Sequence, residues 1–233
     1  MPRVAAYAVA AATAVFAFDA FAGTPLVVFP PRPERLRAVR YAEHDRKACL
    51  AELEARQIPF RKGPPVPTID APIRLSGPMR GVHFEMFHPT ARDPKGPLMD
   101  CRLALSLDDT AIIARDAGFS RVRYNSIHRG RWARVPGQRH AAGVAIDVVE
   151  LVRPDGNVLN VKRDFVGAGI GSKTCGPDAA EAPAGKARAL RDFVCALDKS
   201  RSFNLILTPH YDRRHDDHLH LEVRRKIKWF LTQ

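Results

Sequence analysis

The 233-residue sequence lacks several patterns that would place it in a common class of protein. None of its four cysteines stands in a Cys-x-x-Cys pair, which argues against a zinc site built from thiolates. Although the formal net charge is +12, there is no helix-turn-helix spacing, no RNA-binding aromatic pair and no Cys/His finger. Positive charge alone raises encounter rates with any polyanion, including anionic cell-envelope polymers and phospholipid surfaces. We therefore expect no nucleic-acid partner.

A long apolar run is also missing. The longest such stretch, Val4 to Phe18, falls short of the roughly twenty residues that a membrane span requires. Arg3 precedes it, and Ala20-Phe21-Ala22 follows with small residues at the two positions that a signal peptidase reads. Residues 1–22 are thus expected to be an export signal cleaved after Ala22, with an uncleaved N-terminal anchor as the alternative. We expect an exported protein, periplasmic or secreted, with a membrane-anchored protein as the alternative.

Cysteines are few, but their number is even. In an oxidising compartment thiols usually pair, and four cysteines allow three connectivities. We favour Cys49 with Cys101 and Cys175 with Cys195, because these partners are nearer in sequence. The alternative is that some of them are buried free thiols.

The composition, with 45% hydrophobic and 27% charged residues, is typical of a soluble globular protein, and the length suits one domain. Residues 23–33 hold four prolines and are expected to form an extended tether. The single domain would then occupy residues 34–233.

Hydrophobic spacing predicts an α+β domain, in which helices lie before and beside a small, mostly antiparallel sheet. Helices are expected over residues 34–57, 101–117 and 185–199. Strands are expected over 119–127, 144–152, 158–161, 204–208 and 219–223. Proline and glycine recur from residue 60 to 97, where only short strands are expected, near 71–75 and 81–87. Residues 167–185 are expected to form a surface loop.

The nine histidines are unevenly distributed. Four of them lie in two short segments, His140 to Asp147 and His215 to Val223. Imidazoles beside carboxylates suit a first-row metal such as zinc. The sequence therefore predicts a metal site.

The first segment places Asp147 in a predicted strand. Alternation puts Asp147 on one face with Ala145 and Val149, whose small size leaves room for a ligand. Gly143 allows a tight turn between His140 and the strand. The alternative is that Asp147 caps a turn and His140 is a surface histidine.

The second segment places His218 and His220 two residues apart in a strand, and hence on one face, whereas Leu219 and Leu221 face the core. Both imidazoles could address one metal, one as a ligand and the other through bound water. Asp216-Asp217 could orient them. A polar edge strand would show the same spacing.

Together the two segments carry the patterns His-x-x-Gly-x-Ala-x-Asp and His-x-x-His-x-His. These patterns resemble the zinc-dependent peptidoglycan peptidases grouped with D-alanyl-D-alanine carboxypeptidases, lysostaphin-like enzymes and the periplasmic murein endopeptidase. Within that group the sequence is most similar to extensin-like C-terminal domain proteins. The resemblance spans roughly residues 49–223 and implies a D-Ala-D-Ala peptidase/hedgehog-like fold.

The resemblance also implies roles for particular residues. It makes His140, Asp147 and His220 the three zinc ligands, which leaves a fourth position for water. His218 would be the general base and His215 a second catalytic imidazole, since the pKa of histidine lies near working pH.

The resemblance is incomplete in three places. An arginine after a Tyr-x-Cys run is usual, whereas Tyr124 is followed here by Asn-Ser-Ile-His, so Arg129 is the nearest candidate for stabilising the carbonyl oxygen and Arg123 the next. Gln138 stands where a serine is common, and residues 68–71 replace a Gly-Cys pair. These departures concern the substrate cleft and the cysteine framework more than the ligands.

These features favour an exported zinc peptidase that hydrolyses peptide bonds in peptidoglycan stems or cross-links. Peptidoglycan or its peptide fragments would be the partner. The alternative is a non-catalytic envelope-binding module that retains the peptidase fold. Retention of a base beside three ligands argues against that alternative, because a pure binder would not need one.

Overall fold

The computed structural model describes residues 26–88, 96–130, 139–167 and 169–233. The predicted export signal, the start of the predicted tether and Gln138 lie outside these ranges. Within the described ranges no helix has the length and apolar character needed to cross a membrane.

The larger of two sheets has eight strands, in the order β1-β11-β9-β10-β7-β6-β4, with β8 also paired to β7. Its strands are β1 (Val27–Val28), β4 (His83–Met86), β6 (Arg121–Ser126), β7 (Ala145–Val152), β8 (Val158–Asn160), β9 (Leu205–Leu207), β10 (Leu219–Glu222) and β11 (Phe230–Thr232). Only the β4–β6 and β9–β11 pairs are parallel among these described strands. The prediction of a mostly antiparallel sheet in an α+β domain is confirmed, but the sheet is larger than predicted.

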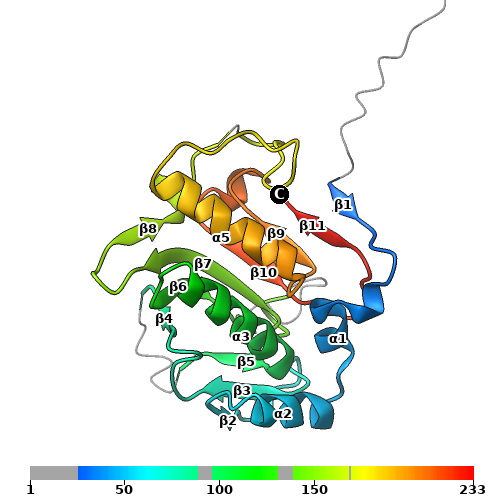
Figure 1. Cartoon of the computed structure of the whole chain (residues 1–233). Helices are drawn as coiled ribbons and strands as arrows, with labels where there is room; N and C mark the ends of the chain where they lie inside the picture. The colour runs from blue at the N-terminus through cyan, green and yellow to red at the C-terminus, as the bar shows by residue number, and fades with distance from the viewer. Residues whose placement is uncertain (1–25, 89–95, 131–138, 168) are drawn as a thin grey trace, which may run out of the picture.

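A second sheet of three strands lies beside the first, in the order β2-β3-β5. Its strands are β2 (Phe60–Lys62), β3 (Pro72–Leu75) and β5 (Leu98–Asp100). The helices are α1 (Arg37–Glu43), α2 (Arg46–Ala55), α3 (Cys101–Asp116), α4 (Val161–Asp164) and α5 (Lys186–Ser200), with short 3₁₀ turns η1 (Pro33–Arg35) and η3 (Arg213–His215). Figure 1 shows the second sheet beside α2, below the larger sheet.

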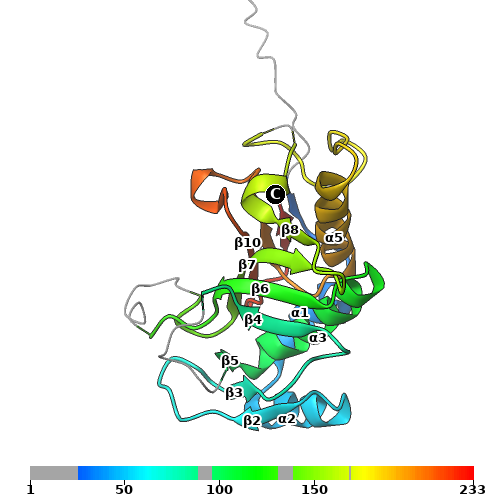
Figure 2. The ribbon, with the colours of Figure 1, turned by 90° about the vertical axis from the view of Figure 1, so that its left-hand side faces the viewer.

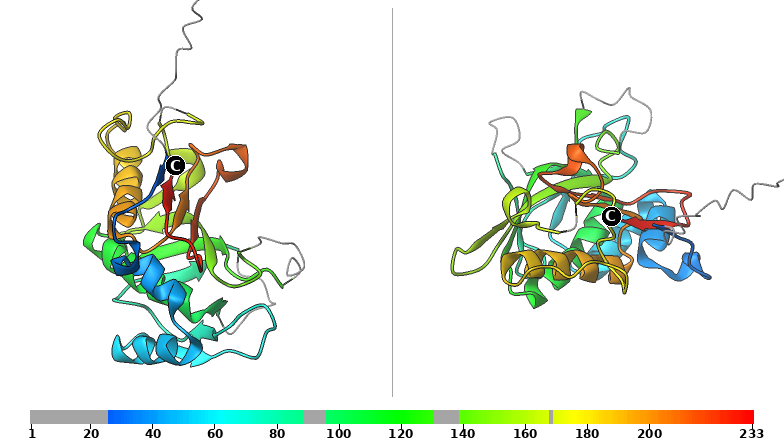
Figure 3. Two further views of the ribbon diagram at one scale, coloured as in Figure 1. Left: turned by 90° about the vertical axis from the view of Figure 1, so that its right-hand side faces the viewer. Right: turned by 90° about the horizontal axis from the view of Figure 1, so that it is seen from above.

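The helices α3 and α5 cover one face of the larger sheet. The connection from β9 to β10, which carries η3, projects from the opposite face (Figures 2 and 3). In β7, Ile146 and Val148 belong to the main hydrophobic core, together with Leu103 and Leu107 of α3. Because side chains alternate along a strand, Asp147 then lies on the face away from these helices.

Helix α3 matches its prediction because its ends are well signalled. Asp100 precedes the helix, and its carboxylate accepts a hydrogen bond from the Arg102 backbone N–H at 3.0 Å. Gly118 follows the helix with φ +81, a left-handed conformation that glycine adopts without strain. Helical spacing places Leu103, Leu107 and Ala111 on one stripe, and all three are fully buried.

The helix predicted over residues 34–57 is wrong as a single element. It is divided into η1, α1 and α2, because Leu36 and Asp45 have extended backbones with ψ of 145 and 172. The Asp45 carboxylate accepts a hydrogen bond from the Ala48 N–H at 2.7 Å, which starts a new helix. The hydrophobic periodicity of the sequence does not reveal the break between these helices, because apolar residues continue across it.

The predicted tether is also partly wrong. Val27 and Val28 pair with Leu231 and Phe230 of β11, a strand that the sequence did not predict. The beginning of the described chain is therefore fastened to its C-terminal strand.

Both disulfides join the partners that sequence proximity favoured. Cys49 of α2 bonds Cys101 at the start of α3, and Cys175 of the predicted surface loop bonds Cys195 of α5. Each bond therefore links a helix to a neighbouring segment.

We expect Gly167→Ala to destabilise the fold, because a Cβ there would lie 2.1 Å from His210 Nε2. The His210 ring cannot easily move, since it lies edge-on to Phe165 and its Nδ1 is 3.2 Å from Thr174 Oγ1. The free energy of unfolding in urea should fall by about 1–3 kcal/mol. Gly77→Ala is the matched control, because its Cβ would meet only Pro59 at 3.6 Å. Equal stability of the two variants would show that this contact relaxes without cost.

Candidate metal centre

A row of polar residues crosses three neighbouring strands on the face of the sheet opposite α3 and α5. Asp147 of β7 is the direct partner of Ser126 on β6 and of His220 on β10. Leu219 and Leu221, the neighbours of His220, are fully buried in the core. The alternation expected for β7 and β10 is therefore present, and it brings His220 against Asp147.

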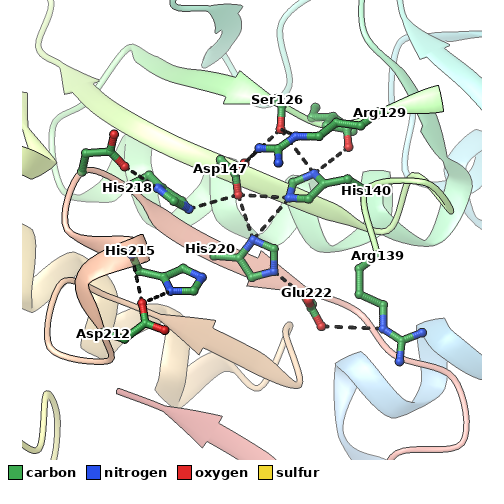
Figure 4. Close-up of polar contacts among 12 residues, drawn as sticks. Ser126, Arg129, Arg139, His140, Asp147, Asp212, His215, His218, His220 and Glu222 are labelled. Atoms are coloured by element: carbon green, nitrogen blue, oxygen red, sulfur yellow. Dashed lines mark hydrogen bonds and ion pairs between the residues drawn. The ribbon is translucent and has the colours of Figure 1, made fainter. Parts of the chain in front are cut away.

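Three side-chain atoms from two distant segments converge at this row. Asp147 Oδ1 lies 3.1 Å from His140 Nε2 and 2.8 Å from His220 Nδ1, and the two nitrogens are 3.3 Å apart. All three residues are at least nine-tenths buried. Figure 4 shows the three side chains pointing toward one another. We call this group the candidate metal centre.

These separations match what a zinc ion would require. Four ligands at about 2.0–2.1 Å from a tetrahedral zinc stand about 3.3 Å from one another. The three observed distances lie between 2.8 and 3.3 Å, so a small expansion would admit the ion. Two imidazoles and one carboxylate also form a donor set that zinc accepts.

The second nitrogen of each histidine faces an oxygen that fixes the tautomer. His140 Nδ1 is 2.8 Å from the Ile127 carbonyl oxygen, and because a carbonyl only accepts, this nitrogen carries the proton. His220 Nε2 is 2.6 Å from Glu222 Oε1. The remaining nitrogens, His140 Nε2 and His220 Nδ1, are thus the ones directed at the centre, an arrangement common for metal-binding histidines.

The buried Asp147 carboxylate is ionised. Burial alone would raise the pKa of Asp147, but contacts with His140 and His220 hold it well below its ordinary value. Ser126 Oγ donates to Asp147 Oδ2 at 2.9 Å, and the Arg129 guanidinium also bonds this oxygen. One carboxylate oxygen is therefore held by the protein, and the other faces the centre.

Histidine 220 balances this charge in the metal-free chain. Burial lowers the pKa of His220, but hydrogen bonds with Asp147 and Glu222 outweigh it and raise the pKa to about 9. Burial likewise favours a higher pKa for Glu222, whereas its bonds to His220 and Arg224 bring it below the ordinary value. A buried carboxylate needs a positive partner. A divalent cation would take the place of the proton on His220 Nδ1.

The other two histidines of the tail border the centre. His218 Nε2 lies 3.4 Å from Asp147 Oδ1, and its Nδ1 is 2.6 Å from Asp217. The His215 ring centroid is 5.2 Å from that of His218, and its Nδ1 is 2.7 Å from Asp212. Each ring is thus oriented by a carboxylate at Nδ1. Of the two acids predicted to orient His218 and His220, Asp217 orients His218, whereas Glu222 rather than Asp216 orients His220.

The two candidate arginines are placed differently. Arg129 reaches the site, where its Nε donates to Ser126 Oγ at 2.8 Å and its guanidinium pairs with Asp147. Arg123 instead pairs with Glu150 at 3.0 Å and lies 3.6 Å from Glu85. The arginine nearer the first histidine is therefore the one that the structure brings to the centre.

Sequence reasoning missed three residues that support the site: Ser126, Asp212 and Glu222. Glu222 had a signal, because it stands two residues after His220 and so shares its face of β10. Ser126 and Asp212 had none, because their contacts depend on strand register and on a loop turn.

We expect Glu222→Gln to weaken zinc binding by about 10–100-fold, the usual cost of losing a carboxylate behind a ligating histidine. The amide keeps the shape, but its oxygen accepts the hydrogen bond from His220 Nε2–H without carrying a negative charge. Competition with a fluorescent chelator would measure the affinity. Glu85→Gln, on the exposed side of β4, is the matched control. Identical affinities for Glu222→Gln and Glu85→Gln would mean that Glu222 does not tune the centre.

Comparison with known proteins relates the part of the chain that holds the site to one protein family. The chain matches no curated protein and no solved structure. One family model, described as Extensin-like protein C-terminus, matches residues 123–232. This stretch begins in β6 and includes both histidine segments, whereas α1 to α3 and the three-stranded sheet precede it. Over residues 123–232 the chain is therefore similar to extensin-like C-terminal domains.

Proposed function

We propose that this protein is an exported zinc peptidase that hydrolyses peptide bonds in peptidoglycan stems or cross-links. The observation that carries the proposal is the convergence of His140 Nε2, Asp147 Oδ1 and His220 Nδ1 within 3.3 Å of one another. Because each histidine is also oriented through its other nitrogen, the arrangement favours metal ligands over an ordinary buried ion pair.

His140, Asp147 and His220 would hold the zinc ion. When bound, zinc lowers the pKa of a coordinated water and polarises the scissile carbonyl. Three protein ligands are the number found in catalytic zinc sites, whereas structural sites usually have four. A structural role is therefore the less suitable interpretation of this donor set.

His218 is the proposed general base. Its Nδ1 is fixed by Asp217 at 2.6 Å, which turns Nε2 toward the centre, 3.4 Å from Asp147 Oδ1. From this position Nε2 would accept a proton from the attacking water and later pass it to the leaving amine. The negative charge of Asp217 would stabilise the protonated ring between these two events.

His215 and Arg129 are the proposed supporting groups. His215 lies beside His218, oriented by Asp212, and could donate a hydrogen bond to the developing oxyanion. Arg129 is engaged with Asp147 and Ser126, so its first effect would be to keep one carboxylate oxygen away from the metal. We accordingly propose it as a positioning residue that could also offset charge on the carbonyl oxygen.

The substrate class rests on the two motifs, which resemble those of peptidoglycan peptidases, and on the proposed D-Ala-D-Ala peptidase/hedgehog-like fold. The net charge of +12 would favour the anionic cell wall. The proposed location is the periplasm or the outside of the cell, with the N-terminus as a possible tether.

Digestion of defined muropeptides, followed by mass spectrometry of the products, tests this function. We expect the zinc-loaded protein to release a product shortened at a peptide bond, and Asp147→Ala to release none. A zinc-loaded protein that leaves every fragment intact but binds them would instead favour the non-catalytic envelope-binding module.

A further inference from the structure

A second polar site lies beside the candidate metal centre. It is a pocket of about 220 Å³, lined by more arginines than acids. Its charged residues are Arg102, Arg139, Arg224, Arg225, Asp70 and Asp100. We call it the arginine pocket.

The arginine pocket lies next to the candidate metal centre, because residues of the two sites are neighbours in the sequence. Arg139 directly precedes His140, and Arg224 follows two residues after Glu222. Glu222 bonds His220 through one oxygen and Arg224 through the other. In Figure 4 Arg139 lies on the far side of Glu222 from His220, so the pocket and the centre are on opposite sides of this carboxylate.

The acids of the pocket are already engaged. Asp100 accepts both hydrogen bonds of Arg102 Nη1, at 2.9 and 3.1 Å. Asp70 accepts from Arg102 at 2.7 Å and from Arg225 at 3.1 Å. Four guanidinium groups thus face two carboxylates, and counting Glu222 as a third still leaves positive charge in excess. An excess of buried or half-buried positive charge favours a bound anion.

Two buried polar atoms at this pocket need a partner. Thr68 Oγ1 and Arg139 Nε are buried and have no hydrogen-bond partner among the described residues. Arg139 Nε lies 3.9 Å from Glu222, which is too far for a hydrogen bond. Leaving such buried groups without a hydrogen bond is unfavourable, and a bound ligand that accepts from them would remove that cost.

We infer that the arginine pocket binds one oxyanionic group, a carboxylate or a phosphate. Guanidinium groups match the planar, paired oxygens of these groups, and a threonine hydroxyl adds a neutral donor. The volume suits a single small group rather than a length of polymer. This site does not require the metal centre, so it stands apart from the proposed peptidase activity.

Isothermal titration calorimetry with the full chain tests the inference. The probes are acetyl-D-alanine, its uncharged amide and inorganic phosphate. The variants are Arg139→Ala and Arg225→Ala, with Arg115→Ala as the charge-matched control, because Arg115 pairs with Asp116 on the exposed surface of α3. Asp147→Ala removes the candidate metal centre and leaves the pocket.

We expect acetyl-D-alanine or phosphate to bind the wild type at least roughly tenfold more tightly than the amide does. That binding should fall by a similar factor in Arg139→Ala and Arg225→Ala and persist in Arg115→Ala and Asp147→Ala. The Arg225 side chain is 53% exposed, so its variant should fold normally. Stronger binding of the acid would assign a carboxylate source, and stronger binding of phosphate a phosphate ester.

Three results would overturn the inference. The first is equal affinity for the acid and its amide together with no phosphate binding. The second is unchanged affinity in both pocket variants. The third is loss of binding in Asp147→Ala but not in Arg139→Ala, which would place the anion at the metal centre instead.

Discussion

Asp147→Ala and His220→Ala should each reduce the zinc content of the purified protein from about one ion per chain to roughly a tenth of that value or less. Asp147 Oδ1 touches both histidine nitrogens, so removing it leaves two ligands with no charge to neutralise the ion. Removing the His220 ring leaves one imidazole and one carboxylate. Mass spectrometry of the bound metal, after dialysis against zinc-containing and zinc-free buffer, measures the effect.

The matched control is His83→Ala, because His83 is an exposed histidine of β4 outside the centre. It should retain the wild-type zinc content. A wild-type protein that takes up no metal under these conditions would refute the metal centre, and with it the proposed peptidase. Equal losses in all three variants would trace the zinc to nonspecific sites.

His218→Ala should keep its zinc but lose about 10²–10⁴-fold in kcat on muropeptides, the usual contribution of a general base. His218 is not among the three converging ligand atoms, so its removal should leave metal affinity nearly unchanged. Asp217→Asn should lower kcat by a smaller factor, because the ring remains but is oriented without a charge. Steady-state kinetics and metal analysis on the same preparations separate the two effects.

Wild-type turnover in His218→Ala would mean that another group accepts the proton. His215 would then be the next candidate, since its ring lies 5.2 Å from that of His218. A simultaneous loss of zinc would instead show that His218 is itself a ligand. Its Nε2 lies only 3.4 Å from Asp147 Oδ1, so it is close enough for that role.

Features of the site that depend on neighbouring residues could be predicted from the sequence. Strand alternation predicts that His218 and His220 share a face and that Leu219 and Leu221 enter the core, and the buried leucines agree. Helix α3 could also be predicted from the sequence, because Asp100 and Gly118 mark its ends. Such features depend only on residues within a few positions of one another.

Contacts between residues far apart in the sequence could not be predicted from sequence patterns. The direct pairing of Asp147 with His220 and Ser126 depends on the register of three strands from separate parts of the chain. The pairing of β1 with β11 joins the two ends of the described chain, and two-residue strands have no periodicity to detect. The arginine pocket likewise assembles four separate segments, none of which has a recognisable pattern alone.

The pairing of β10 with β7 has a consequence for folding. Because side chains alternate, a slip of one residue would turn His220 into the core and place Leu221 opposite the carboxylate. An ion held by Asp147 and His220 together would bind only the correct alignment and would stabilise it by mass action. Zinc present during refolding would then favour the correct strand register over shifted ones. It would do so by joining His140 and His220, which are 80 residues apart in the sequence.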